Sequence, residues 1–315
     1  MLKDINIKIN GLTEKVSLEV VSALKDIVDN FSSLDFRRLE KIVITSNFER
    51  DVESLTSANQ TSFKNRYRAN QDTYAVVLTI PKKDDFELVL VIKTSFITNI
   101  LTSHEKQSYK DAFHIIHHEL AHIHDNNKKI DIFKDLMKTT KYKGKSSILF
   151  PIAEECWSEY IANYISSNSA LETQFPKIMA KNLIKKINSA SQNIKTQLLA
   201  FKINKKRDDL LFSSIEDIKS LLKTAAYLQG YLHGFNMTLE ELDYDSDYNL
   251  ECSYFKDIWE AMQYEFYSMK EIYPDGFINL SIYQDLAFYI DAFFNQMGIV
   301  FDMNEKGDLE IKVMY

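Results

Sequence analysis

One uninterrupted segment, from Ser108 to Asn126, sets the strongest limit on how this chain can fold. It contains no glycine and no proline, and it holds five of the seven histidines of the 315-residue sequence. Its apolar residues repeat at intervals of three and four, at Phe113, Ile116, Leu120 and Ile123. This spacing predicts an amphipathic helix with one face that packs against a core. One face of this helix can therefore pack against the core, while the opposite face, which carries histidines, lines a cleft.

The segment contains the sequence His118-Glu119-Leu120-Ala121-His122, which has the form H-E-x-x-H. Residues four apart on a helix lie one turn above each other, so His118 and His122 can bind one metal ion while Glu119 stands beside it. This arrangement is typical of a zinc peptidase. The alternative is a surface helix that happens to be rich in histidine.

A catalytic zinc ion usually takes three protein ligands, so two histidines are not sufficient. The neighbouring histidines are poor candidates for the third position. His114 continues the row of His118 and His122 along one straight helix, and three ligands in such a row cannot surround a tetrahedral ion. His117 and His124 point to other sides of the helix. We expect these three histidines to pack in the core or to support the ligands through hydrogen bonds.

Glu159 is the better candidate for the third ligand. A second helix is predicted over residues 152–166, and on it Glu155, Glu159 and Asn163 form one polar stripe at intervals of four. A carboxylate from this stripe completes a set of two histidines and one glutamate around zinc. Asn163 is then placed to orient a ligating imidazole. Taken alone, the stripe is also typical of an ordinary solvated helix face.

The H-E-x-x-H motif followed by Glu159-Tyr160-Ile161-Ala162-Asn163 resembles the gluzincin zinc metallopeptidases. The resemblance is to compact members of the ImmA/IrrE type, whose second motif reads Glu-x-x-Ala-Asn or Glu-x-x-Ala-Asp, and it covers residues 86–166. It implies a zincin-like catalytic core that cleaves a peptide or protein substrate. It also implies Zn²⁺ held by His118, His122 and Glu159, with Glu119 as the general base.

Peptide hydrolysis also needs a donor for the oxyanion that develops on the attacked carbonyl. His233 is the only histidine that follows the histidine-rich segment His114–His124, and Tyr231 lies two residues before it. We expect one of these two residues to stabilise the transition state, with His233 as the first candidate. Gly230 and Gly234 indicate that their helix approaches another helix closely. The alternative is a tightly packed core helix with one satisfied histidine.

The remaining pattern predicts an α+β fold. Two strands, 74–80 and 86–92, are separated by a short polar loop and should form a small antiparallel sheet before the histidine helix. A mostly helical C-terminal region follows and ends in a β-hairpin over residues 299–313. We expect a catalytic core over residues 1–170 and a helical region over residues 171–315. Seven glycines and four prolines are too few for a many-turned all-β fold.

Composition excludes several classes of partner. The net charge of −7 and the pI near 5.6 offer no overall attraction for nucleic acid or anionic lipid. The sequence predicts no signal peptide and no membrane span. Two cysteines, Cys156 and Cys252, form neither a disulfide framework nor a C-x-x-C metal site. These features predict a cytoplasmic protein, and a zinc site of nitrogen and oxygen ligands would not need the cysteines.

Two other functions remain open at this stage. The first is a catalytically silent zincin fold that serves as a binding or regulatory module. The second is a histidine-rich metal-binding protein, in which the additional histidines would be ligands. The metal stoichiometry separates the second from a peptidase, because a peptidase should bind one zinc ion per chain.

Overall fold

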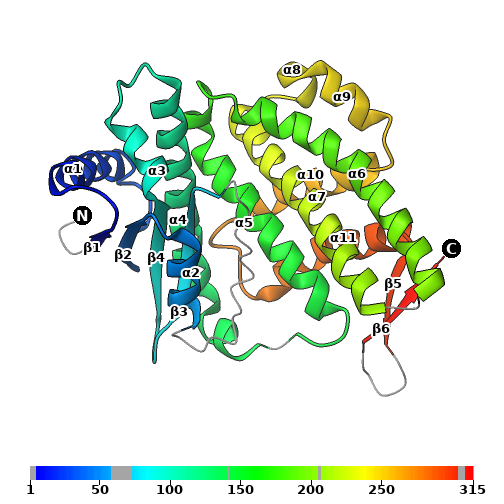
Figure 1. Ribbon diagram of the computed structural model, residues 1–315. Coiled ribbons are helices and arrows are strands. Elements are labelled where there is room, and N and C mark those ends of the chain that lie inside the picture. The colour runs from blue at the N-terminus through cyan, green and yellow to red at the C-terminus, as the bar shows by residue number, and fades with distance from the viewer. Residues whose placement is uncertain (1–4, 58–72, 141, 205–206, 304–308, 315) are drawn as a thin grey trace. The chain divides into compact units, whose positions relative to one another are not determined.

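The computed structural model describes residues 5–57, 73–140, 142–204, 207–303 and 309–314. It contains many helices and two small sheets (Figure 1), which confirms the predicted α+β class. The chain divides into two compact units: Met1–Lys138 with Ile165–Thr173, and Thr139–Tyr164 with Gln174–Tyr315. Helix α5 (Ser146–Ala170) contributes residues to both units. The boundary expected at residue 170 stays a prediction.

The first unit combines one sheet with helices. Its elements are β1 (Asn6–Ile9), α1 (Glu14–Asn30), β2 (Leu39–Thr45), α2 (Phe48–Ser57), β3 (Ala75–Pro81), β4 (Phe86–Lys93), α3 (Thr94–Ile97), η2 (Thr98–Leu101) and α4 (Gln107–Thr139). The sheet has the strand order β1-β2-β4-β3.

The strand directions correct one expectation about this sheet. Strands β3 and β4 pair antiparallel, as the sequence predicts. The sheet as a whole is mixed rather than antiparallel, because β2 runs parallel to both β1 and β4. A parallel pair needs a crossover connection, and α1 provides one between β1 and β2.

Both faces of the sheet are covered by helices. On one face, Leu88 and Leu90 of β4 share a buried cluster with residues of α1 and α4. On the other face, Val89 and Val91 pack with Phe48 and Val52 of α2. A strand with two buried faces has a nearly continuous apolar sequence, as β4 does. The apolar stripe of α4 therefore lies in the core, and its histidines project from other sides of the helix.

The second unit is mainly helical. Besides part of α5, it contains α6 (Phe175–Asn204), α7 (Arg207–Phe235), α8 (Leu239–Leu242), α9 (Tyr244–Glu251), α10 (Lys256–Ile272), η3 (Leu280–Tyr283), α11 (Gln284–Gln296), β5 (Ile299–Met303) and β6 (Leu309–Val313). Helices α6 and α7 run side by side (Figure 1). Strands β5 and β6 form the predicted terminal hairpin. Within the described ranges, no helix has both the length and the apolar character that a membrane crossing demands.

Candidate metal centre

Helix α4 presents the two motif histidines to a common point. The Nε2 atoms of His118 and His122 lie 3.0 Å apart, and their rings are nearly perpendicular, at 86°. Two nitrogen ligands of a tetrahedral zinc ion are roughly 3.3 Å apart, given Zn–N bonds of about 2.0–2.1 Å. The spacing of the two imidazoles therefore fits one shared metal ion.

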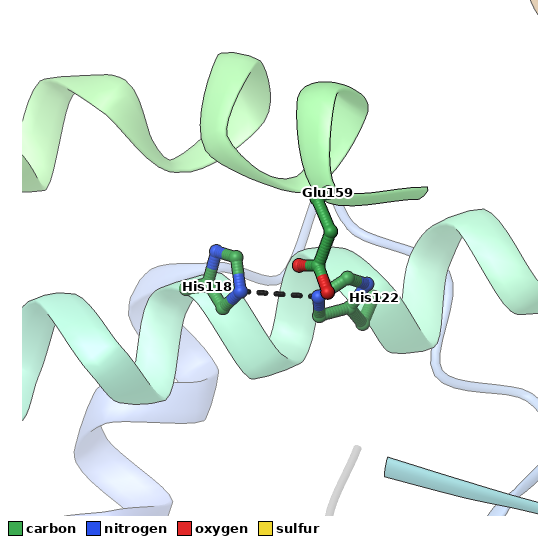
Figure 2. Close-up of side chains that lie close together, drawn as sticks. All are labelled: His118, His122 and Glu159. Atoms are coloured by element: carbon green, nitrogen blue, oxygen red, sulfur yellow. Dashed lines mark hydrogen bonds between the residues drawn. The ribbon is translucent and has the colours of Figure 1, made fainter. Parts of the chain in front are cut away.

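Glu159 of α5 completes this group. One ligand atom from each of His118, His122 and Glu159 lies within 4.8 Å of the others. Figure 2 shows the Glu159 carboxylate extending from its helix toward the two imidazoles. In the part of the chain that the structure describes, this is the one group of three or more histidine, cysteine, aspartate or glutamate side chains that could hold a metal ion. We call His118, His122 and Glu159 the metal group. Two imidazoles and one carboxylate are a donor set that zinc prefers.

The C-terminal end of α5 is bound to α4 within the first unit. The Nδ1 atoms of His114 and His117 each lie 2.9 Å from Ser169 Oγ, and Ser169 Oγ donates to the carbonyl of Ser166 at 2.7 Å. These contacts fix the last turns of α5 along α4.

The three histidines outside the metal group interact with other protein groups. Burial lowers the pKa of His114 to about 3, with the charge of His117 acting in the same direction, and burial lowers the pKa of His117 to about 4. His117 also stacks on Phe31 at a ring distance of 3.7 Å. His124 Nδ1 accepts a hydrogen bond from the backbone N–H of Asp35 at 2.9 Å. These contacts are of the kind expected for histidines that pack in the core or support the ligands through hydrogen bonds.

Glu119 lies directly after His118 in the motif, and it is 8 % exposed. At about 100° per residue, its direction is roughly 80° around α4 from the mean direction of His118 and His122. Glu119 is therefore on a different side of α4 from the two histidines, and it is not part of the three-residue group. That separation suits a base that acts on a group held at the metal.

An ion pair that the sequence analysis missed lies at Glu159. Lys223 Nζ of α7 is 3.0 Å from Glu159 Oε1. Burial opposes the charge of Lys223, but the charges of Glu159 and Glu155 outweigh burial and raise the pKa of Lys223. One turn away, Lys219 Nζ lies 2.8 Å from Glu155 Oε1. The matching intervals of four in the two helices were a visible signal, although they do not reveal which helices meet.

The two candidate oxyanion donors project from different sides of α7, because residues two apart on a helix differ by about 200°. His233 Nδ1 lies 2.8 Å from Tyr160 Oη, and its ring meets those of Tyr160 and Tyr267 edge-on. Tyr231 is buried, and both burial and the negative charge of Glu159 raise the pKa of its phenol. His233 is not part of the three-residue group, whereas Tyr231 is within electrostatic reach of a member of it.

Asn163 and Gly230 hold α5 and α7 together. The Asn163 side chain donates from Nδ2 to the carbonyl of Tyr227 at 2.9 Å, so this amide links two helices where we expected it to orient an imidazole. A Cβ atom on Gly230 would lie 2.4 Å from the carbonyl oxygen of Tyr160 and 2.8 Å from Asn163 Cβ. The close helix approach predicted at Gly230 is therefore present.

Comparisons with known proteins add no family to this description: no family model, no curated protein and no solved structure matches the chain.

Proposed function

We propose that this protein is a zinc-dependent peptidase with a gluzincin-like, zincin-type catalytic core. The observation that carries the proposal is the convergence of His118, His122 and Glu159, with ligand atoms within 4.8 Å of one another, around the H-E-x-x-H helix. His118, His122 and Glu159 would hold the ion, and Glu119 would act as the general base. The substrate is a peptide or protein.

The protein groups have separate roles in this reaction. Zinc, when bound, supplies a Lewis acid that acidifies water and polarises a carbonyl. The Glu119 carboxylate accepts the proton of the attacking water and later delivers it to the leaving amine. Helices α4 and α5 hold the side chains of the three ligands in position around the ion.

Helix α7 carries both candidate donors to the oxyanion, Tyr231 and His233. Tyr231 has a pKa above its usual value, so its phenol keeps the proton that it must donate. His233, the first candidate from the sequence, has its Nδ1 engaged with Tyr160. We therefore place Tyr231 before His233 as the donor, while His233 supports the aromatic group around Tyr160.

Neither alternative function has an observation in its favour. A metal-storage protein would use additional histidines, yet His114 and His117 contact Ser169, and His124 contacts the backbone of Asp35. A catalytically silent module has no need for the acidic residue of the motif, and Glu119 is intact.

The deciding experiment replaces the base and leaves the ligands in place. We expect Glu119→Gln to bind one zinc ion per chain and to lose hydrolysis of a sensitive peptide by a factor of about 10² or more. The matched control is Glu155→Gln, which changes a carboxylate outside the metal group and should retain activity. Full turnover by Glu119→Gln would contradict the peptidase assignment, and more than one tightly bound zinc per chain would favour a storage protein.

A further inference from the structure

Two lysines of α7 form successive ion pairs with two glutamates of α5. Lys219 Nζ is 2.8 Å from Glu155 Oε1, and Lys223 Nζ is 3.0 Å from Glu159 Oε1. Lys223 Nζ also lies 3.7 Å from Glu155 Oε2. Of the two glutamates, Glu159 belongs to the metal group. The two pairs are therefore alike in chemistry and differ in whether the carboxylate is a candidate ligand.

We propose that Lys223 is a built-in counter-cation of the metal ligand Glu159, and that it lowers the metal affinity of the site by stabilising the metal-free form. The inference rests on the proposed function, since it takes Glu159 as a ligand. It assigns to Lys223 a role that neither the motif nor the metal group reveals.

The sign of the effect follows from the charges in the two states. Without metal, the Glu159 side chain is only 12 % exposed, and a carboxylate buried to that degree is costly without a partner. Lys223 supplies such a partner, 3.0 Å from Glu159 Oε1. With metal bound, the ion itself compensates Glu159, and Lys223 becomes a positive charge close to another positive charge. Lys223 thus stabilises the metal-free state and destabilises the metal-bound state.

An opposing effect is the orientation that Lys223 gives to the carboxylate. This contribution is smaller, because the packing of α5 against α7 already encloses the Glu159 side chain. Solvent reduces the charge effect, since the Lys223 side chain is 30 % exposed. The net expectation remains weaker metal binding in the presence of Lys223. A further consequence is a loaded site with one more positive charge, which strengthens the Lewis acid.

The test measures zinc affinity by competition with a chromogenic chelator, using the full-length chain. We expect Lys223→Met to bind zinc at least about tenfold more tightly than the wild type, a difference of about 1.4 kcal/mol. Its metal-free form should melt at a lower temperature. Lys223→Arg keeps the cation and should bind within about threefold of the wild type. Lys219→Met, the matched control, removes the neighbouring ion pair and should also bind within about threefold.

Several results would overturn the inference. Unchanged affinity in Lys223→Met would make the lysine a bystander, and weaker binding would make it a residue that only orients Glu159. If the Met variant does not fold without metal, Lys223→Gln gives the same comparison with a polar side chain.

The visible spectrum of the cobalt(II) form checks the ligand set. It should be the same in wild type and variant if Glu159 still binds the metal.

The two proposals fail in different ways. If the wild type binds one zinc ion and Glu159→Gln weakens that binding, the metal centre is supported. If Lys223→Met then binds zinc with unchanged affinity, only the inference about Lys223 fails. If the wild type binds no zinc, or Glu159→Gln has no effect on affinity, the metal centre falls and the role of Lys223 falls with it.

Discussion

At the scale of single residues, Glu155 and Glu159 provide the sharpest contrast. Both lie on α5 and both pair with lysines of α7, but only Glu159 belongs to the metal group in the described structure. We expect Glu159→Ala to weaken zinc binding by a factor of about 10² or more, since it removes one of three ligands. Glu155→Ala should change the zinc affinity by less than about tenfold.

The measurement is a zinc titration of each variant against a chelator of known affinity, with circular dichroism as the check on folding. The reverse order of effects would mean that the motif has been assigned one helical turn out of register, and that Glu155 is the ligand.

Tyr231 and His233 give a second contrast between residues. Tyr231→Phe removes one hydroxyl from a buried ring near the charge of Glu159, and we expect kcat to fall by about 10²-fold with unchanged zinc content. His233→Ala should have a smaller effect on kcat, because its Nδ1 already contacts Tyr160. Peptidase kinetics at saturating substrate give kcat for each of the two variants. A larger loss in His233→Ala would restore the assignment made from the sequence.

At the scale of helices and strands, the close contact of α5 with α7 is the feature to test. Gly230→Ala places a methyl group 2.4 Å from the Tyr160 carbonyl oxygen, so the helices must separate. Overpacking of this kind costs about 1–3 kcal/mol. Gly234→Ala adds the same methyl to the same helix at a half-buried position and serves as the control. Urea denaturation should show a clear loss for Gly230→Ala, and equal stability of the two variants would contradict the contact.

The sequence predicted the longer elements because their periodic patterns are strong. Strand β4 and the histidine helix follow directly from apolar spacing, and so does the antiparallel pairing of β3 with β4. Helix α2 was missed, since its buried residues Phe48 and Val52 are sparse within a polar segment. The parallel arrangement of β2 depends on how the crossover connections pack. The spacing of apolar residues along a strand does not determine the direction of its neighbours.

For the candidate site too, the sequence predicts what local spacing determines and not what depends on tertiary packing. The local rule of four-residue spacing identified His118 and His122 as a pair, and the polar stripe of α5 indicated Glu159. Lys223 was not found, because an ion pair between α5 and α7 depends on tertiary packing. The hydrogen bond from Asn163 to the Tyr227 carbonyl was missed for the same reason. Motif spacing therefore finds the three residues that could hold a metal ion, and it does not find the groups that contact them or their helix from α7.

At the scale of the whole molecule, zinc should be linked to folding. The ligands come from two helices that are separate in sequence, so the complete group of His118, His122 and Glu159 exists only in the folded chain. A ligand that binds only the folded state at 100 times its Kd adds about 2.7 kcal/mol of stability. The gain here should be smaller, because five histidines close together in the unfolded chain also bind zinc.

We therefore expect a chelator to lower the melting temperature and zinc to restore it. In the His118→Ala/His122→Ala variant, the added zinc should have little effect, since the remaining glutamate cannot hold the ion alone. Magnesium is the matched ion control, because it prefers oxygen ligands and should not replace zinc at two imidazoles. Differential scanning calorimetry with and without each ion measures these shifts. A zinc-induced shift of equal size in the double variant would place the bound metal away from His118 and His122 and would contradict the proposed centre.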